Sequence, residues 1–381
     1  MKQSCDVIVV GAGPAGATLA YHLAKKGIKV LLLEKERLPR YKCCAGGVTA
    51  RAVKLLDFDI SEVVEDVVHN VSVTYNFGNP YVGHHTQPLI YTMMRDVFDY
   101  FLVKRAQQFG AVVIDGQEVR QIQTNADWIE ISTAEGIFRS RLVAGADGAY
   151  SIVARKLGMR RNTEYIAAIE AEVVVPEEEL AKRKSQVEIY LGGIPEGYAW
   201  IFPKRDHLSI GAGCLASKAR DLNHHYHKFL GSLTIGDYAV ARASSHLIPT
   251  CKGKTIVSQD KALLLGDAAG LASPLTGEGI YNAIQSAQLA APVIENSLAQ
   301  GKIELQDYQQ AVEEKIMSEM RIARTLSRIF VRFPHLALRM LNQDERVWRG
   351  YCYHLRGEIN YATIKERLGG FKGIFALLSR M

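Results

Sequence analysis

The sequence predicts an α/β fold: a parallel sheet covered by helices, a second domain built on an antiparallel sheet, and a helical C-terminal region. Three observations lead to this prediction. Within the first 34 residues, a buried strand, a glycine-rich turn, a helix and a second strand follow one another. Residues 190–204 alternate aromatic and smaller side chains, which is the periodicity of a strand. The residues from 301 onward are typical of helices.

The first of these segments has the layout of a nucleotide-binding unit. Residues 5–10 are an apolar run that suits a strand buried on both faces. Gly11, Gly13 and Gly16 follow as G-x-G-x-x-G, and residues 14–26 continue as a helix. In such a unit the first glycine makes the tight turn, the second lets the backbone approach a pyrophosphate, and the third lets the helix pack closely on the strand. The free N–H groups at the helix start favour phosphate binding.

Glu34 stands at the end of the next apolar strand, residues 29–33. A carboxylate there can accept hydrogen bonds from both ribose hydroxyls of an adenosine, and it repels a 2′-phosphate. The run therefore predicts a Rossmann-like domain that binds FAD or NAD rather than NADP. The glycines alone are a weak signal, because a glycine-rich turn has the same letters. The order of strand, glycines, helix, strand and acid carries the prediction.

Two later dipeptides distinguish FAD from NAD. Residues 141–148 end in the pair Asp-Gly at Asp147, and the strand within 262–270 ends in Gly-Asp at Asp267, before a long apolar helix over about 277–299. Either pair alone is more typical of a turn. Together with G-x-G-x-x-G, and in this order, they resemble the flavoprotein monooxygenase and reductase superfamily built like para-hydroxybenzoate hydroxylase. The resemblance implies FAD, with Asp267 on the ribityl chain and Asp147 close to the cofactor.

Two segments narrow the resemblance. Residues 273–281 contain Thr-Gly-Glu-Gly-Ile where the aromatic hydroxylases usually carry a G-x-R-G-x-N type of sequence, and this is similar to the geranylgeranyl reductases. Residues 190–204 match that family's pattern Y-x-x-x-x-P-x-G-Y-x-W-x-F-P-K at every fixed position. The chain thus resembles the geranylgeranyl reductase family of FAD-dependent oxidoreductases.

The matching segment predicts the substrate pocket. Alternation places Tyr198, Trp200 and Phe202 on one face of a strand, where they can line an apolar channel beside the flavin. Ordinary sheet core is the alternative, since alternating aromatics are common there. The predicted substrate contacts are Tyr190, Gly193, Tyr198, Trp200, Phe202 and Pro203.

A cysteine loop completes the predicted site. Residues 41–47 resemble the family's K-x-C-G-G loop beside the isoalloxazine, which places Cys44 at the family cysteine and Ala45 at a position that is usually glycine. The resemblance implies a role for Cys44 in shaping the pocket or supplying a proton, while an inert, small apolar cysteine is the alternative. Cys44, Tyr198 and Trp200 are the predicted catalytic residues.

The predicted cofactor contacts include an arginine. Arg95 matches the family's R-x-x-F-D-x-x-L helix, whose arginine meets FAD and can bridge its phosphate and ring oxygens. A solvated helix charge is the alternative. The full set is Gly11, Gly13, Ala15, Gly16, Glu34, Lys35, Cys44, Ala45, Gly46, Arg95, Val119, Asp147, Asp267, Gly277, Gly279 and Ile280.

The motifs divide the chain into interleaved parts. The FAD-binding domain is predicted to be discontinuous, over residues 1–72, 95–160 and 255–300. Residues 73–94 and 161–254 form the predicted substrate domain, and 301–381 the C-terminal helical region. We find no second strand–G-x-G-x-x-G–helix unit, so the electron donor is expected to be a visiting NAD(P)H or a small electron-transfer protein such as ferredoxin.

Composition limits the protein class. The 381 residues are 48% hydrophobic and 23% charged, which excludes a disordered chain, a collagen-like repeat and a small disulfide scaffold. Six scattered cysteines without a C-x-x-C pair predict a reducing compartment and no structural metal. No apolar run is long enough to cross a membrane, and the first residues do not resemble a secretory leader, so we expect a protein that is neither transmembrane nor secreted. The mild net charge of +6 gives no reason to expect a nucleic-acid partner. The expected location is cytoplasmic.

The positive charge is concentrated near the end of the chain. Residues 301–381 hold 14 Lys and Arg against 9 Asp and Glu. Arg321, Arg324, Arg328 and Arg332 recur at helical spacing and are expected on one face. Two interpretations stay open: an ordinary solvated face, or a basic amphipathic helix that rests on the cytoplasmic face of an anionic membrane, from which a prenyl lipid would enter.

The resemblance implies a reaction. An FAD-dependent enzyme of this family would saturate isolated C=C double bonds in the geranylgeranyl (polyprenyl) chain of a lipid or diphosphate, with hydride from N5 of reduced FAD and a proton from elsewhere. A flavin monooxygenase or halogenase is the alternative enzyme, although Tyr198 and Phe202 depart from the halogenase pattern G-W-x-W-x-I-P. A flavoprotein electron carrier is the non-enzymatic alternative.

Overall fold

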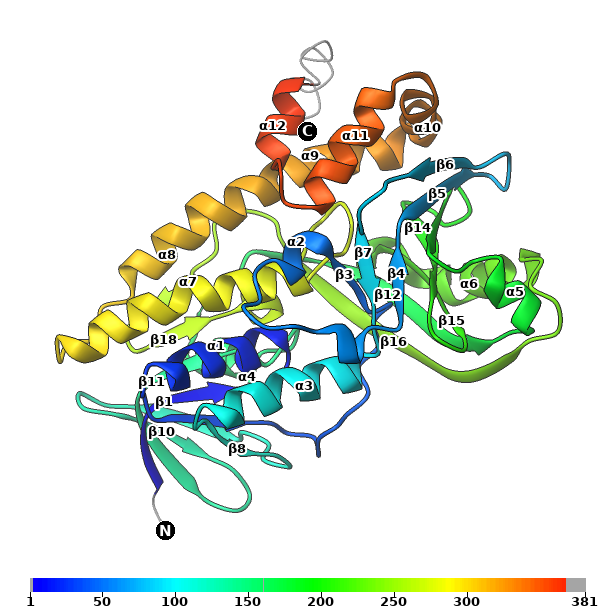
Figure 1. Cartoon of the computed structure of the whole chain (residues 1–381). Helices are drawn as coiled ribbons and strands as arrows, with labels where there is room; N and C mark the ends of the chain where they lie inside the picture. Colours follow the sequence, from blue (N-terminus) through cyan, green and yellow to red (C-terminus); the bar gives the residue numbers. More distant parts are fainter. Residues whose placement is uncertain (1–2, 160, 368–381) are drawn as a thin grey trace.

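The structure is a computed structural model that describes residues 3–159 and 161–367. Three sheets and a C-terminal group of helices make up the described part of the chain (Figure 1). The sheets have eight, seven and three strands. The predicted α/β class, with one parallel sheet, one mainly antiparallel sheet and C-terminal helices, is confirmed.

The eight-stranded sheet carries the nucleotide-binding unit. Its main path runs β17-β18-β11-β1-β2-β8, and β1, β2, β8, β11 and β18 are parallel. The strands are β1 Gln3–Val10, β2 Val30–Leu33, β8 Val112–Ile114, β9 Gln121–Thr124, β10 Ile129–Ser132, β11 Ile137–Gly145, β17 Ser258–Gln259 and β18 Ala262–Leu264. Because the carboxyl ends of parallel strands meet at one edge, the loops after β1, β2, β11 and β18 converge there.

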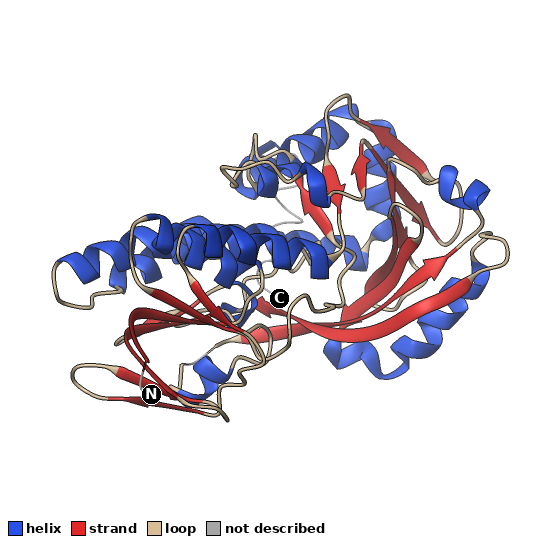
Figure 2. Ribbon diagram, turned by 60° about the horizontal axis from the view of Figure 1, so that its bottom comes forward, coloured by secondary structure: helices blue, strands red, loops and turns tan. Residues whose placement is uncertain are grey.

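Long helices cover one face of this sheet, as Figure 2 shows. They are α1 Pro14–Lys25, α3 Arg95–Gln108 and α7 Ile280–Ala299, and α1 lies between the other two. The short helix α4, Ile152–Lys156, follows β11. Helix α7 begins three residues later than the sequence indicated, because Gly277 has the left-handed φ of +69° and the loop continues to the N-cap Gly279.

The seven-stranded sheet has the order β16-β12-β15-β14-β13-β5-β6 and is antiparallel except between β13 and β5. Its strands are β5 Asn70–Tyr75, β6 Tyr81–His84, β12 Thr163–Val174, β13 Gln186–Leu191, β14 Gly197–Pro203, β15 Leu208–Leu215 and β16 Ala239–Cys251. Helices α5 Glu177–Ala181 and α6 Leu222–Ser232, with the 3₁₀ turn Ala216–Asp221, accompany it. An apolar cluster fills the space between the sheet and α6.

A small sheet and its neighbours connect the two larger sheets. The strands β3 Gly47–Thr49, β4 Asp66–Val68 and β7 Ile90–Thr92 pair in the order β3-β7-β4. Helix α2, Ala50–Val53, follows β3, and a 3₁₀ turn spans Ser61–Val63. Strand β3 begins directly after the cysteine loop, so this small sheet fixes one end of that loop.

Of the C-terminal helices, α9 to α12 lie toward the end of the molecule away from β1, whereas α8 lies beside α7 (Figure 1). The C-terminal helices are α8 Gln306–Val312, a π-helical segment Glu313–Met317, α9 Ser318–Arg332, α10 Pro334–Gln343, α11 Glu345–Leu355 and α12 Tyr361–Arg367. Pro334 interrupts the helical run after α9 and occupies the first turn of α10. Trp348 of α11 packs on the backbone of Gly83 and donates a hydrogen bond to the His84 carbonyl at 3.0 Å. None of the helices in residues 3–159 and 161–367 has the length and apolar character that a membrane span requires.

Candidate functional site

A cavity of about 2700 Å³ joins the carboxyl edge of the eight-stranded sheet to the inner face of the seven-stranded sheet. Its volume is well above the 300–1,000 Å³ typical of a site for one small molecule. At one end it is lined by the loops that follow β1, β2, β11 and β18, and at the other by aromatic and aliphatic side chains and by α9, α10 and α11. The cavity therefore has room for a dinucleotide and a second, largely apolar molecule.

The glycine loop has the geometry of a phosphate cradle. Gly11 has φ +100°, and a Cβ at Gly16 would lie 1.9 Å from the Gly11 carbonyl oxygen, so this helix can approach β1 only with glycine there. Gly13 is the N-cap of α1 and provides no side-chain cap. The first N–H groups of α1 therefore remain available to a pyrophosphate.

Glu34 is held firmly at the end of β2. The residue is 4% exposed. One carboxylate oxygen accepts a hydrogen bond from the Ala12 N–H at 2.8 Å, and the other from the Glu36 N–H at 3.1 Å. Arg40 lies 3.6 Å from the same carboxylate. A carboxylate has about four acceptor positions, so Glu34 keeps capacity for ribose hydroxyls.

Two aspartates supply acceptors further along the cavity. Asp147 accepts hydrogen bonds from the N–H groups of Ile152 and Val153 through one carboxylate oxygen, at 2.7 and 3.1 Å. Its other oxygen is buried and has no hydrogen-bond partner among the described residues. Asp267 follows β18, and burial raises the pKa of its carboxyl. Unpaired carboxylate oxygens in a cavity fit a ligand that carries hydroxyl groups.

The start of α7 points its unsatisfied N–H groups into the same space. Its N-cap is Gly279, without a side-chain cap. Gly277, Gly279 and Ile280 line the cavity. The partial positive charge of a 20-residue helix favours a negatively charged ring or oxygen at this point. With the glycine cradle, Glu34 and the two aspartates, these groups fit FAD from its phosphates to its ring.

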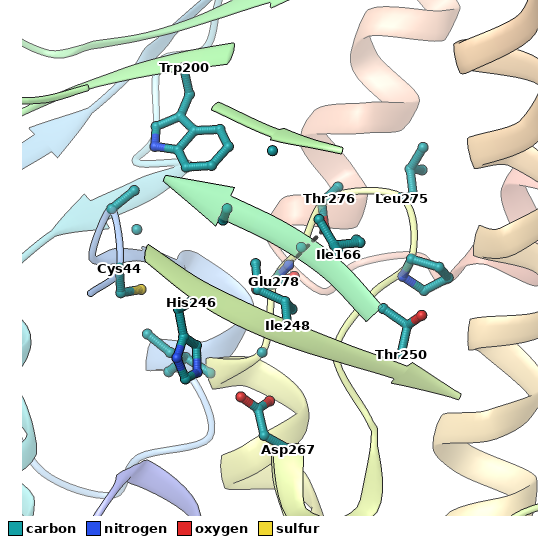
Figure 3. A pocket seen from close by; sticks show the side chains of 18 of the residues that line it. Cys44, Ile166, Trp200, His246, Ile248, Thr250, Asp267, Leu275, Thr276 and Glu278 are labelled. Carbon is teal, nitrogen blue, oxygen red and sulfur yellow. Dashed lines mark hydrogen bonds between the residues drawn. The ribbon is translucent and has the colours of Figure 1, made fainter. Parts of the chain in front are cut away.

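Positive charge surrounds the ring end of the cavity. Arg95 forms a buried, two-pronged pair with Asp99, at 2.8 and 2.9 Å. Lys42 Nζ lies 2.6 Å from Nε2 of His246. Burial, followed by the charge of Arg95, lowers the pKa of Lys42 to about 8, and burial with Lys42 lowers the pKa of His246 to about 4. At neutral pH His246 is therefore a neutral acceptor. Figure 3 shows it between Cys44 and Asp267.

The cysteine loop is fastened by a buried lysine. Lys204, just after β14, is fully buried and donates hydrogen bonds to the carbonyls of Ala45 and Met93 at 2.7 and 2.8 Å. Cys44 Sγ accepts a hydrogen bond from the Gly46 N–H at 3.4 Å. The last residue of the aromatic motif thus holds the loop that presents Cys44 to the cavity.

The aromatic strand lines the other half of the cavity. Tyr198, Trp200 and Phe202 all face it, as the alternation predicted. The rings of Tyr198 and Trp200 lie 5.7 Å apart at 58°. The Tyr198 hydroxyl donates to the Thr276 carbonyl at 2.7 Å, which ties this wall to the loop before α7. Ile166 and Ile248 from neighbouring strands add apolar surface (Figure 3).

Three predicted substrate contacts lie outside the cavity: Tyr190, Gly193 and Pro203 do not line it. Tyr190 belongs to the opposite face of β13 from Ile189, packs on Phe229 with ring centroids 5.0 Å apart, and donates to Glu188 at 2.5 Å. Pro203 directly follows Phe202 in β14, so its side chain points to the opposite face of the strand. Because a strand alternates its faces residue by residue, only Tyr198, Trp200 and Phe202 among residues 198–203 reach the pocket. Pro195 and Gly197, just before them in the pattern, also line it.

Two predicted cofactor contacts lie outside the cavity and act through packing of the loops that line it. Gly16 and Gly46 do not line the cavity. Gly16 permits the close approach of α1 to Gly11, and a Cβ at Gly46 would lie 1.9 Å from the Met93 carbonyl oxygen. The other predicted residues line the cavity together: Gly11, Gly13, Ala15, Glu34, Lys35, Cys44, Ala45, Arg95, Val119, Asp147, Asp267, Gly277, Gly279 and Ile280.

The arginines of α9 do not form a uniform solvent face. Arg324 is largely buried and donates hydrogen bonds to Glu164, to Thr250 at 3.2 Å and to the Cys251 carbonyl at 2.6 Å. At 100° per residue it lies about 60° from Arg321 toward the buried stripe of the helix. Arg321, Arg328 and Arg332 are exposed, so the expectation of four arginines on one exposed face is wrong at one position.

Among the titratable side chains that line or border the cavity, sequence reasoning missed Lys42, Glu170, Glu172 and His246. Glu170 and Glu172 are 2% and 6% exposed. The available signal was two acids at i and i+2 within the otherwise apolar strand 165–175, because that spacing puts both on one face.

Comparison with known proteins agrees with this geometry. Residues 4–217 match the family model described as FAD binding domain. An uncharacterized protein of Methanosarcina barkeri is 32% identical over 85% of this chain and 83% of its own length. The chloroplastic geranylgeranyl diphosphate reductase of Nicotiana tabacum is 28% identical over 87% and 75%.

Solved structures share the fold. A geranylgeranyl bacteriochlorophyll reductase-like protein of Thermoplasma acidophilum superposes with a TM-score of 0.78 at 24% identity, over 86% of this chain and 88% of that one. A flavin-dependent brominase has the same TM-score at 18% identity, over 97% and 99%. The family match covers more than half of the chain, and the chain therefore belongs to the FAD-binding domain family of flavoproteins, in which it has relatives named geranylgeranyl reductases.

Proposed function

We propose that the protein reduces isolated C=C double bonds in the geranylgeranyl chain of a lipid or diphosphate. The observation that carries this proposal is the continuity of the cavity: the carboxylates and helix starts that fit FAD open directly onto the wall formed by Tyr198, Trp200 and Phe202. That wall is apolar and long enough to reach α9 and α11. A linear hydrocarbon is the kind of ligand that such a surface favours.

When bound, reduced FAD supplies the hydride. An isolated alkene offers no carbonyl for a protein to polarise, so the residues must act by position, by excluding water and by providing a proton. In this proposal Trp200 and Tyr198 hold the chain against the cofactor, and Cys44 shapes the pocket from the opposite loop. The cofactor is held next to the wall of Tyr198, Trp200 and Phe202 by Asp147, Asp267 and the start of α7.

The electron donor has no domain of its own in the described residues. We propose that NAD(P)H or a small electron-transfer protein such as ferredoxin reduces the flavin as a visitor. Peripheral membrane contact through Arg321, Arg328 and Arg332 is part of the same proposal, because the prenyl chain has to leave a bilayer. Liposome flotation of the wild type and of the triple Gln variant tests it, and equal flotation overturns it.

An anaerobic single-turnover experiment tests the reaction. The purified protein is reduced with dithionite and mixed with geranylgeranyl diphosphate or a geranylgeranylated lipid. The expected result is reoxidation of the flavin together with a product heavier by two hydrogens per double bond. Trp200→Ala should slow this step, whereas Trp128→Ala, far from the cavity on the turn before β10, is the matched control.

The same experiment separates the alternatives. A strict requirement for oxygen would identify a monooxygenase or halogenase. Halide-dependent consumption of oxygen would distinguish the halogenase. If the flavin accepts electrons from a donor but never passes them to an alkene, the protein is an electron carrier.

A further inference from the structure

The reduction needs a proton donor inside an apolar cavity, and the structure contains an unused acid at that place. Glu170 lines the cavity from the middle of β12 and is 2% exposed. Opposite it in the sheet lies Gly211 of β15, which is also the register partner of Trp200. The side chains of Glu170 and Trp200 therefore lie on either side of Gly211, on the inner face of the sheet. A carboxyl group in this position borders the surface on which we place the alkene.

A row of polar groups connects Glu170 with solvent. Asp206 is exposed, with 83% of its side chain accessible, and lies 2.6 Å from Nδ1 of His207. Nε2 of His207 lies 3.1 Å from Glu172, whose side chain is 8% accessible. Ser209 is the register partner of Glu172 and donates a hydrogen bond to Glu170 at 2.8 Å. The row thus runs from an exposed residue, Asp206, to the buried Ser209 and Glu170 at the cavity.

We propose that Glu170 is the proton donor of the reduction, and that Glu172, His207 and Ser209 form the route by which solvent restores its proton. The inference rests on the proposed function. The O–H bond of the Glu170 carboxyl breaks as a C–H bond forms at one alkene carbon, while the other carbon receives the hydride that reduced FAD supplies. The alkene gains both electrons from the flavin, and the carboxylate takes a new proton from solvent through His207 and Glu172.

The surroundings of Glu170 suit a donor that is protonated near neutrality. Burial and the neighbouring Glu172 raise the pKa of Glu170 to about 7. Lys204 and the Ser209 hydroxyl oppose this shift. A general acid is most effective when its pKa lies near the working pH.

Other groups around Glu170 leave it the best placed donor. From the cysteine loop, Cys43 and Tyr41 face the two glutamates, and burial with the nearby glutamates raises the pKa of both, that of Cys43 to about 12. From β16, Arg242 stacks on the Tyr41 ring at 3.8 Å. On the outer side of the sheet, Tyr226 of α6 donates to the Ile210 carbonyl at 3.3 Å. Tyr41 lines the cavity and its hydroxyl donates a hydrogen bond to Glu172 at 3.3 Å, but its raised pKa makes it a much weaker acid than Glu170.

The test uses the full-length, FAD-loaded protein in the anaerobic single-turnover assay. Glu170→Gln keeps the shape of the side chain and is expected to slow flavin reoxidation by the alkene at least 100-fold. Reduction of the flavin by dithionite and FAD content should not change. Glu188→Gln is the matched control, because Glu188 is a buried glutamate of the same sheet that does not line the cavity.

Two further measurements distinguish a proton donor from a structural residue. The wild-type rate should fall as pH rises through about 7, and Ser209→Ala should move that midpoint upward, since the hydroxyl stabilises the charged carboxylate. Infrared spectra of the protein without substrate should show a carboxyl C=O band that disappears over the same pH range and is missing in Glu170→Gln.

The outcomes separate the two proposals. If the wild type reduces the alkene and Glu170→Gln does so equally fast with the same pH profile, the proton-donor assignment is overturned. If the wild type never reduces an alkene, the proposed function fails, and this inference falls with it. A carboxyl band that is unchanged by Glu170→Gln would also overturn the assignment.

Discussion

Replacing Glu170 by Gln should stabilise the protein at high pH, independently of any catalytic role. Burial raises the pKa of this carboxyl in the folded state from 4.5 to about 7. Between these two pH values the unfolded chain has released the proton while the folded chain still holds it. The folded state therefore loses stability as pH rises through this window, and the loss is complete above about pH 7.

The magnitude follows from the two pKa values. Each pKa unit corresponds to about 1.4 kcal/mol, so the rise from 4.5 to about 7 costs the wild type about 3 kcal/mol at pH 8 relative to pH 4.5. The glutamine in Glu170→Gln would carry no charge at either pH, and the variant would escape this loss. With an unfolding entropy typical of a chain this long, about 3 kcal/mol corresponds to a melting-temperature difference of about 4 °C.

The assay is thermal unfolding of the wild type and of Glu170→Gln, with FAD bound, from pH 5 to pH 8. The difference in melting temperature between variant and wild type should grow by about 3 °C over this range in favour of the variant, because a small part of the loss has already occurred at pH 5. Glu188→Gln is the control for the loss of a buried carboxyl elsewhere in the sheet. A difference that stays constant with pH, or that grows in favour of the wild type, would refute the reasoning that Glu170 is a desolvated acid.

Three other substitutions probe the cofactor loop and the C-terminal helices. Gly16→Ala should abolish stable FAD binding, measured by retained flavin after gel filtration, because the new Cβ meets backbone 1.9 Å away. Arg324→Gln should lower the free energy of unfolding by about 1–3 kcal/mol, since it removes the partner of the half-buried Glu164 carboxylate and of the Cys251 carbonyl. The exposed Arg328→Gln should change the free energy of unfolding by less than about 0.5 kcal/mol. Arg51→Met should lower the free energy of unfolding by about 3–5 kcal/mol, because it leaves Glu278 buried without its partner. The double variant Arg51→Met with Glu278→Met should recover most of that loss. Equal stability of the single and double variants would contradict this.

The nucleotide end of the site was predictable because its signals are local. A glycine loop, an acid at a strand end and two dipeptides each occupy a few consecutive residues, and parallel strands bring their carboxyl ends to one edge. The sequence order was enough to place Glu34, Asp147 and Asp267 in one cavity, and the structure does so. Gly16 was expected to allow close packing of helix on strand, and this is the contact it makes.

The substrate end was harder to predict because it depends on which face of each strand turns inward. The family pattern contains Tyr190 and Pro203, but strand alternation points them away from the cavity. The same alternation brings Glu170 inward, and nothing in the strand's own sequence shows that Ser209 and Lys204 will stand beside it. Arg324 differs from Arg321, Arg328 and Arg332 through its contacts with Glu164, Thr250 and Cys251, all of which lie far earlier in the chain.

One residue of the Thr-Gly-Glu-Gly loop joins the cofactor site to the C-terminal helices. Glu278 forms a buried ion pair with Arg51 of α2 and accepts a hydrogen bond from Thr49 at 2.6 Å. Arg51 stacks on Tyr281 of α7 at 4.1 Å and lies 3.0 Å from Nε2 of His354 in α11.

A buried ion pair contributes little net stability, because desolvation of both charges offsets their attraction, but breaking it on one side is costly. The ion pair between Arg51 and Glu278 instead restricts how the segments that carry these two residues can be arranged. The loop before α7, the small sheet that follows the cysteine loop, and the helix that closes the far end of the cavity therefore have to keep one relative position. A substrate chain that displaces α11 would act on the loop at the cofactor, since both are held by the same guanidinium group.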